Sequence, residues 1–147
     1  MKRLILLILV AIVGTFSLIG CQDEKEVSTT EEYSDMFEST FKDVLNLYIV
    51  TSPILTKEGE ELDKTIKEIN EVIEKLDDES VHFFSEEARE VAGRMTSSAK
   101  KAIEYHKLCL KSHYSSELHQ STMDEITKIA DLMREYEKLY REFLKSR

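Results

Sequence analysis

The chain has 147 residues, with 29 acidic and 20 basic side chains and a formal net charge of −9. This negative balance argues against nucleic-acid binding, because phosphates need Lys and Arg partners, and against a domain that lies flat on an anionic lipid surface. Only one proline and four glycines are present, and the alternating apolar pattern of strands is almost missing. The composition therefore predicts an all-α fold.

The amino terminus has the layout of an export signal. Lys2 and Arg3 precede a run from Leu4 to Phe16 that is almost wholly apolar, as in signals for secretion. Up to Gly20 the apolar stretch has about 17 residues, which is the lower limit for a helix that spans a bilayer. An uncleaved anchor helix is the alternative that this length leaves open.

A processing motif follows the apolar run. Leu18, Ile19, Gly20 and Cys21 resemble the lipobox of bacterial lipoproteins, in which a branched apolar residue, a tolerant position and a small residue precede a cysteine. The resemblance implies that a diacylglycerol is attached to the thiol of Cys21 and that a signal peptidase cuts just before it. It covers residues 1–21 only. It predicts a lipid-anchored protein on the extracytoplasmic face of the cell membrane, and it leaves the family of the mature domain unidentified.

Cleavage before Cys21 divides the chain into a signal peptide (1–20), a polar tether (21–30) and a helical domain (31–147). Loss of the signal removes two bases, so the net charge of the mature chain becomes −11. The mature chain is long enough for one hydrophobic core. Cys109 is the only other cysteine, so acylation of the first leaves no partner for an internal disulfide.

The first helix is predicted to start near Thr29, because Thr29 and Glu32 have the spacing of a capping box. Pro53 lacks a backbone donor, so the helix ends near Thr51, or it kinks there and runs to Gly59 as a carboxy-terminal cap. These two alternatives stay open. Apolar residues recur at steps of three or four, at Tyr33, Phe37, Phe41, Val44 and Tyr48.

The second and third helices are predicted to pack against each other. The second has the four-three spacing of bundle seams, at Leu62, Ile66, Ile69, Ile73 and Leu76. The third starts at Ser85, before two acids that suit a first turn, and runs to about Lys111. Its apolar face is mostly small, which predicts a close approach to the second helix. This face comprises Ala88, Val91, Met95, Ala99, Ala102, Ile103 and Cys109.

Charge supports an antiparallel pairing of these two helices. Nine acids and three lysines lie between Glu60 and Glu79, whereas six bases and four acids lie between Ser85 and Lys111. Exposed ion pairs contribute well under about 1 kcal/mol each, so this complementarity sets register more than stability.

The fourth helix is predicted to begin between Ser115 and Thr122, where Ser121 and Asp124 also have capping spacing. Its seam consists of Ile126, Ile129, Met133, Tyr136, Tyr140 and Phe143. The expected fold is an antiparallel up-down-up-down four-helix bundle, which places the first helix beside the fourth. The aromatic residues of these two helices should then meet, and the pair Phe83–Phe84 should cap one end of the core.

Two groups of residues resemble metal ligands. His106, Cys109 and His113 lie on one helix face, and imidazole and thiolate are ligands for zinc or copper. The simpler interpretation is a buried small cysteine with histidines near a helix end. Glu79 and His82 have the spacing of a di-iron motif, but bundles of that kind need two copies. We therefore expect no metal and no cofactor.

The sequence carries no hydrolase, phosphate-loop or paired-cysteine motif, so we expect no enzymatic activity and no catalytic residues. The predicted function is noncatalytic binding of another cell-envelope protein, in an accessory, inhibitory or exclusion role. The predicted contact surface is the tip of the bundle that carries Ile54, Leu55, His113 and Tyr114. The alternative is an extracytoplasmic sensor for a small ligand or a metal, and self-association of the bundle is a further possibility.

Overall fold

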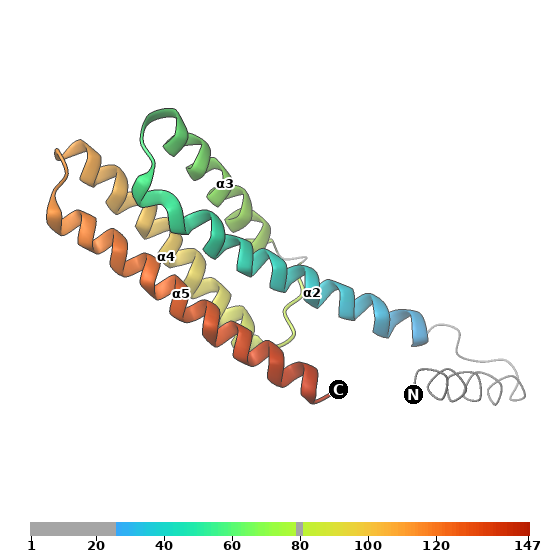
Figure 1. Cartoon of the computed structure of the whole chain (residues 1–147). Helices are drawn as coiled ribbons and strands as arrows, with labels where there is room; N and C mark the ends of the chain where they lie inside the picture. The colour runs from blue at the N-terminus through green and yellow to red at the C-terminus, as the bar shows by residue number, and fades with distance from the viewer. Residues whose placement is uncertain (1–25, 79–80) are drawn as a thin grey trace, which may run out of the picture. The chain divides into compact units, whose positions relative to one another are not determined.

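The computed structural model describes the backbone of residues 26–78 and 81–147, and the side chains from Ser34 onward apart from residues 79 and 80. The all-α fold is confirmed, and no strand occurs in these ranges. The elements are α2 (Glu26–Thr51), the short 3-10 helix η2 (Ser52–Thr56), α3 (Gly59–Asp77), α4 (Glu86–Lys111) and α5 (Ser116–Lys145), shown in Figure 1. Residues from Ser34 onward form one compact unit. No helix within the described residues is long and apolar enough to cross a membrane.

The first helix starts earlier than predicted. It ends at Thr51, which agrees with the first of the two alternatives. The α2 helix begins at Glu26, ahead of Thr29, so part of the predicted tether is helical. The α-helical geometry stops at Thr51, and Pro53 lies in the first turn of η2. The hydroxyl of Thr51 donates to the carbonyl of Leu47 at 2.7 Å, as a helix-interior threonine often does.

The alternative in which the first helix runs on to Gly59 is wrong. Gly59 is the first residue of α3 and does not cap an extended first helix. Its φ of 53° lies in the left-handed region, which a glycine adopts without steric cost. Serine caps start the next two helices, because the hydroxyl of Ser85 accepts from the amide of Ala88 and that of Ser115 accepts from Leu118. The capping role considered for Ser121 is therefore wrong.

The predicted seams form the core. All five seam residues of α3 and all seven residues of the small face of α4 are buried. On α5 the centre of the seam is buried at Ile129, Met133 and Tyr136, whereas Ile126, Tyr140 and Phe143 are half-buried. These faces join in one cluster with Val44 and Leu47 of α2, which shows that periodicity located the core correctly.

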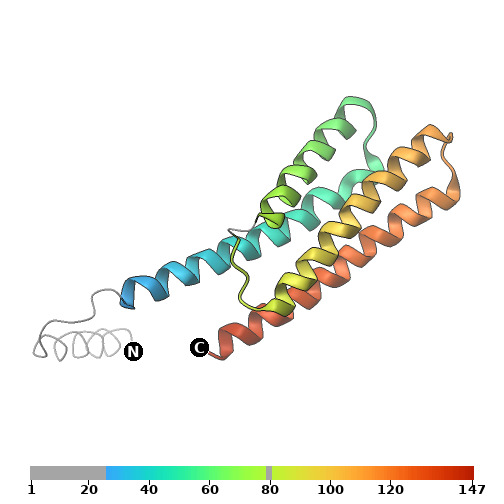
Figure 2. The ribbon, with the colours of Figure 1, turned by 180° about the vertical axis from the view of Figure 1, so that it is seen from behind.

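The small face of α4 does not serve the purpose predicted for it. The backbone of α4 approaches α5 far more closely than it approaches α3, and α4 and α5 lie side by side in Figures 1 and 2. Interaxial distance depends on the side chains at the contact, and the α3 seam presents branched Ile66, Ile69 and Ile73. The small face of α4 therefore does not bring α3 closer to it than α5.

Ion pairs only partly follow the predicted charge pairing. Lys100 of α4 reaches Asp77 of α3 at 3.1 Å, as expected. Arg94 of α4 instead pairs with Glu135 of α5 at 3.6 Å. These pairs are exposed, so each contributes little to stability.

Contacts at both ends of the bundle fit the predicted alternation of helix directions. At one end, the Phe37 ring of α2 meets Phe143 of α5 with centroids 5.3 Å apart. At the other end, Nε2 of His106 on α4 lies 3.0 Å from the carbonyl oxygen of Lys57, just before α3. The part of α2 around Phe37 and the end of α5 therefore share one end of the compact unit.

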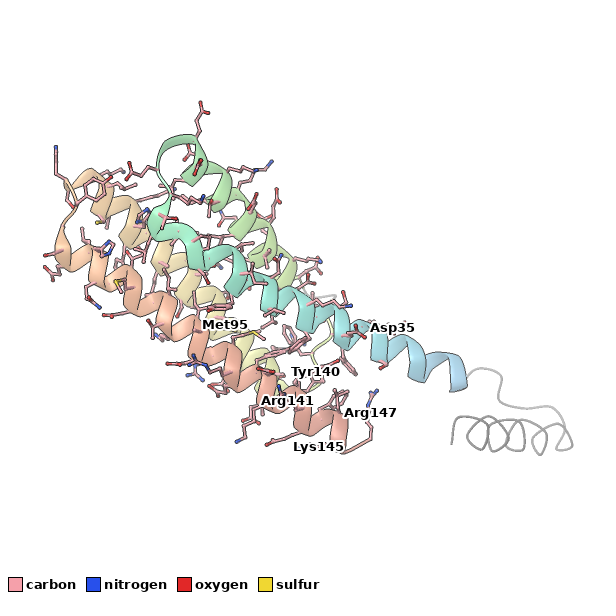
Figure 3. All side chains as sticks on the ribbon, in the orientation of Figure 1. Asp35, Met95, Tyr140, Arg141, Lys145 and Arg147 are labelled. Carbon is pink, nitrogen blue, oxygen red and sulfur yellow. The ribbon has the colours of Figure 1, made fainter. Side chains whose placement is uncertain are left out.

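An aromatic cluster closes that end, as predicted. The Phe41 ring stacks on Tyr140, with centroids 4.6 Å apart, and Tyr140 projects from α5 toward α2 in Figure 3. Phe84 contacts Tyr136 at 5.5 Å and Phe143 at 5.0 Å. Aromatic pairs in these geometries add about 0.5–1.5 kcal/mol beyond their area burial. The cluster therefore ties the α3–α4 connection and α2 to the carboxyl end of α5.

Substitution of two glycines by alanine should change the stability of the fold in opposite directions. A Cβ at Gly93, an exposed position inside α4, would meet no atom within 4 Å. We expect Gly93→Ala to stabilise the fold by about 0.5–1 kcal/mol, because alanine loses less backbone entropy in a helix. Thermal unfolding measures this.

Gly59→Ala is the matched control. There is equal space at that position, but the left-handed backbone of Gly59 costs an L-residue about 1–2 kcal/mol. A lower melting temperature for Gly93→Ala would contradict the assignment of Gly93 to a free helix surface.

Candidate functional site

The predicted lipid-attachment residue, Cys21, lies outside the described residues, as does the whole lipobox. The structure therefore leaves the anchor as a prediction. Cys109 is free and buried, and its Sγ lies 3.4 Å from the carbonyl oxygen of Ser115. This thiol packs at the start of the α4–α5 connection.

The three residues of the candidate metal face do not converge. His106 is 2% exposed, and its ring donates from Nε2 to the carbonyl of Lys57. His113 is exposed beyond the end of α4. No group of three His, Cys, Asp or Glu side chains within the described residues is arranged to hold a metal ion. The possible di-iron motif includes Glu79, which lies outside the described residues.

The predicted contact surface at the tip is partly wrong. Ile54 is fully buried, because η2 turns its side chain into the core. Tyr114 is exposed over 59% of its surface, and its hydroxyl contacts the Glu58 carboxylate across the tip. This hydrogen bond raises the pKa of the Tyr114 phenol, since it stabilises the protonated form. His113 and Tyr114 both have positive φ, of 54° and 64°, so the turn between α4 and α5 is tight.

A more extensive surface feature lies between α2 and α3. Two neighbouring hollows, of about 410 and 290 Å³, have Val50 and Glu68 in common among their lining residues. We call these two hollows together the α2–α3 groove. Its lining residues are Asp43, Asn46, Ile49, Val50, Pro53, Lys57, Glu61, Lys64, Thr65, Glu68, Glu71, Val72 and Lys75.

Both aliphatic and charged side chains line the α2–α3 groove. Val72 is buried, Val50 is half-buried, and Ile49 is 56% exposed, which is a large exposure for an aliphatic side chain. At one end of the groove, Lys75 bridges to Asp43 at 2.7 Å and links α3 to α2. Apolar side chains that stay accessible on helices are features of surfaces that bind a partner helix.

Charge is distributed unevenly between the two halves of the bundle. Residues 34–51 of α2 carry three carboxylates and one lysine, and α3 carries seven carboxylates and three lysines. The net charge of these two segments together is −6. The α4 helix has four acids and six bases, and α5 has seven acids and five bases. Together α4 and α5 therefore carry no net charge. The α2–α3 groove lies in the acidic half, but its own lining is nearly balanced, with four carboxylates and three lysines.

Sequence reasoning missed this groove for a physical reason. The seam pattern shows which residues point inward, but it does not show how far apart two neighbouring helices lie. The one available signal was Ile49, an aliphatic residue beside the core positions of the first helix. A single exposed aliphatic residue is normal on protein surfaces, so it did not indicate a site.

A smaller hollow of about 210 Å³ lies between the end of α3 and α4, beside Arg89 and Gly93. The guanidinium of Arg89 lies 5.4 Å from the centre of the Phe83 ring. Ligand pockets usually measure about 300–1,000 Å³, so this hollow suits at most a very small ligand.

No known protein family matches the chain, and neither the curated proteins nor the solved structures include one with significant similarity to it.

Proposed function

We propose that this protein is a lipid-anchored lipoprotein of the cell envelope whose helical bundle binds another envelope protein without catalysing a reaction. Its role would be accessory, inhibitory or excluding. The observation that carries the binding proposal is the α2–α3 groove, where the exposed aliphatic side chain of Ile49 lies beside Val50 among charged side chains. The anchor rests on the lipobox-like sequence that ends at Cys21.

The anchor predicts a specific labelling result. Cells that express the full chain and are fed a radioactive fatty acid should label the protein, and Cys21→Ala should lose the label completely. The unprocessed variant should also migrate as a larger precursor. Label that persists in Cys21→Ala would contradict the lipoprotein assignment.

The second cysteine supplies the control for that experiment. Cys109→Ala should keep the label, because Cys109 is buried in the bundle and lies far along the chain from the lipobox. Equal loss of label in both variants would point to a general defect in export, and the lipoprotein assignment would then lack support.

The alternative, a sensor for a small ligand or metal, is supported by the hollow beside Arg89. Thermal unfolding separates the two functions, since a ligand that binds the folded state raises the melting temperature by mass action. We expect zinc, copper and amino-acid mixtures to leave the melting temperature unchanged. A saturable increase would favour the sensor.

A further inference from the structure

We propose that a cationic stripe on the solvent face of α5 binds an acidic helix of the partner protein. The stripe comprises Arg134, Lys138, Arg141 and Lys145. This inference rests on the proposed function, because it adds a second contact surface and the charge of the partner to the protein binding proposed above. The spacing, exposure and charge of the four residues carry it.

The four side chains form one line along α5. They follow one another at steps of four, three and four residues, which places them on the same side of a helix. From Arg134 to Lys145 the stripe rises roughly 16 Å, at about 1.5 Å per residue. In Figure 3, Arg141 and Lys145 lie at the edge of α5 that faces away from α2.

The whole stripe is accessible to a partner. All four side chains are exposed, and the first three have between 70% and 77% of their surface free. Leu144 is 51% exposed at the carboxyl end of the stripe. This leucine adds an aliphatic contact to a surface that is otherwise charged.

The stripe carries an excess of positive charge, although α4 and α5 together are neutral. Its four cations line a surface hollow of about 330 Å³, together with the two carboxylates of Glu137 and Glu142. Four cations and two carboxylates give this lining a net charge of +2. The α2–α3 groove, in contrast, has four carboxylates and three lysines. A surface with excess positive charge attracts an anionic partner and excludes a cationic one.

Ion pairs within α5 leave these cations available. Three of the four have a carboxylate of α5 at 2.5–3.9 Å, whereas Lys145 has no ion-pair partner among the described residues. The three pairs are exposed and therefore weak, so a carboxylate of the partner can replace the neighbour within α5. The two arginines suit this exchange, because a guanidinium binds a carboxylate through two N–H groups.

An acidic helix matches the spacing of the stripe. A helix that runs alongside α5 presents carboxylates one turn apart when Asp or Glu recurs every three or four residues. Each carboxylate then meets one cation, as charged residues pair between neighbouring helices of a coiled coil. An anionic lipid surface fits less well, because the acidic bundle would have to lie flat on the headgroups.

In-cell photocrosslinking provides the test. In the full chain, a benzophenone amino acid replaces Leu144 at the stripe, Ile49 in the α2–α3 groove or Tyr114 at the tip, all of which are exposed. We expect the Leu144 position to crosslink to a protein segment in which Asp or Glu recurs every three or four residues. A crosslink from Leu144 to phospholipid, to a second copy of this chain, or to a segment without that pattern would overturn the proposal.

Charge reversal supplies a matched control. Lys138→Glu with Lys145→Glu changes the stripe, whereas Lys101→Glu with Lys107→Glu makes the same change in net charge on exposed sites of α4. The stripe variant should lose the Leu144 crosslink, and the α4 variant should keep it. Lys138→Arg with Lys145→Arg preserves the charge and should also keep the crosslink. Equal loss in both reversed variants would overturn the proposal, because net charge alone would then explain binding.

A synthetic helical peptide of leucine and glutamate measures the affinity. We expect this peptide to bind the purified full chain about tenfold more weakly after reversal at Lys138 and Lys145, and to be little affected by the α4 reversal. An isomer with lysine in place of glutamate should bind much more weakly than the glutamate peptide. Equal affinity of the two peptides would overturn the charge argument.

The outcomes separate the two proposals. Crosslinks to a protein from Ile49 or Tyr114 but not from Leu144 would reject the stripe and leave noncatalytic protein binding in place. No protein crosslink from any of the three positions would reject both proposals.

Discussion

Tyr136→Ala is expected to destabilise the bundle by about 3–5 kcal/mol, the usual cost of removing a large aromatic side chain from a core. Tyr136 is fully buried, and its ring lies 5.5 Å from Phe84 and 6.1 Å from Phe41. Its removal leaves a cavity where α2, the α3–α4 connection and α5 meet. Urea unfolding followed by circular dichroism measures the loss.

Tyr136→Phe separates the ring from its hydroxyl. The phenol oxygen is buried and has no hydrogen-bond partner among the described residues. A buried polar atom without a partner costs about 1–3 kcal/mol, so this variant should match or exceed the wild type in stability. A loss as large as that of the alanine variant would show that the hydroxyl, and not the packing of the ring, stabilises this position.

The same hydroxyl predicts a dependence on alkaline pH. Burial raises the pKa of Tyr136, and the nearby Tyr140 adds to the shift. The unfolded chain therefore loses this proton at lower pH than the folded chain does. Stability is complete below the ordinary tyrosine pKa of about 10, and above it the wild type should lose up to about 1.4 kcal/mol per pH unit relative to Tyr136→Phe. Identical pH profiles would contradict a buried phenol.

His106→Ala is the second large expected effect, a destabilisation of about 2–4 kcal/mol. The imidazole of His106 is buried and donates to the carbonyl of Lys57, so alanine removes a hydrogen bond and leaves that carbonyl without its partner. The truncated side chain also leaves space in the core. Chemical denaturation again gives the free energy of unfolding.

His113→Ala is the control for this result. His113 is exposed, and a surface substitution usually changes stability by no more than about 0.5 kcal/mol. If the two histidines instead shared a metal, both variants should lose stability only in metal-loaded protein. Equal effects of a chelator and of His106→Ala would therefore contradict the structural role.

The helices and the core were predictable because both follow from local spacing. The four-three pattern from Leu62 to Leu76 places one residue in the core at nearly every turn, and the same holds from Ile129 to Tyr136. The cap at Ser85 was predictable because the acids that follow it suit a first turn. The meeting of Phe41 with Tyr140 followed from the predicted order of the helices.

Other features depend on distances that no local pattern contains. Ile54 lies in a segment that reads as a loop, and only the 3-10 geometry after Thr51 turns it into the core. The closest approach of α4 is to α5, because the shape of whole side-chain layers decides how helices pair. The position of the α2–α3 groove also depends on the distance between two helices, so it was not available from the sequence.

The contact between Phe37 and Phe143 has a consequence for the order of folding. These two rings lie almost at opposite ends of the compact unit in sequence, so their contact closes nearly the longest loop that the domain can form. Closing such a loop costs conformational entropy before any contact repays it. A chain that emerges with its amino end first therefore cannot form the contacts Phe37–Phe143 and Phe41–Tyr140 until α5 has arrived.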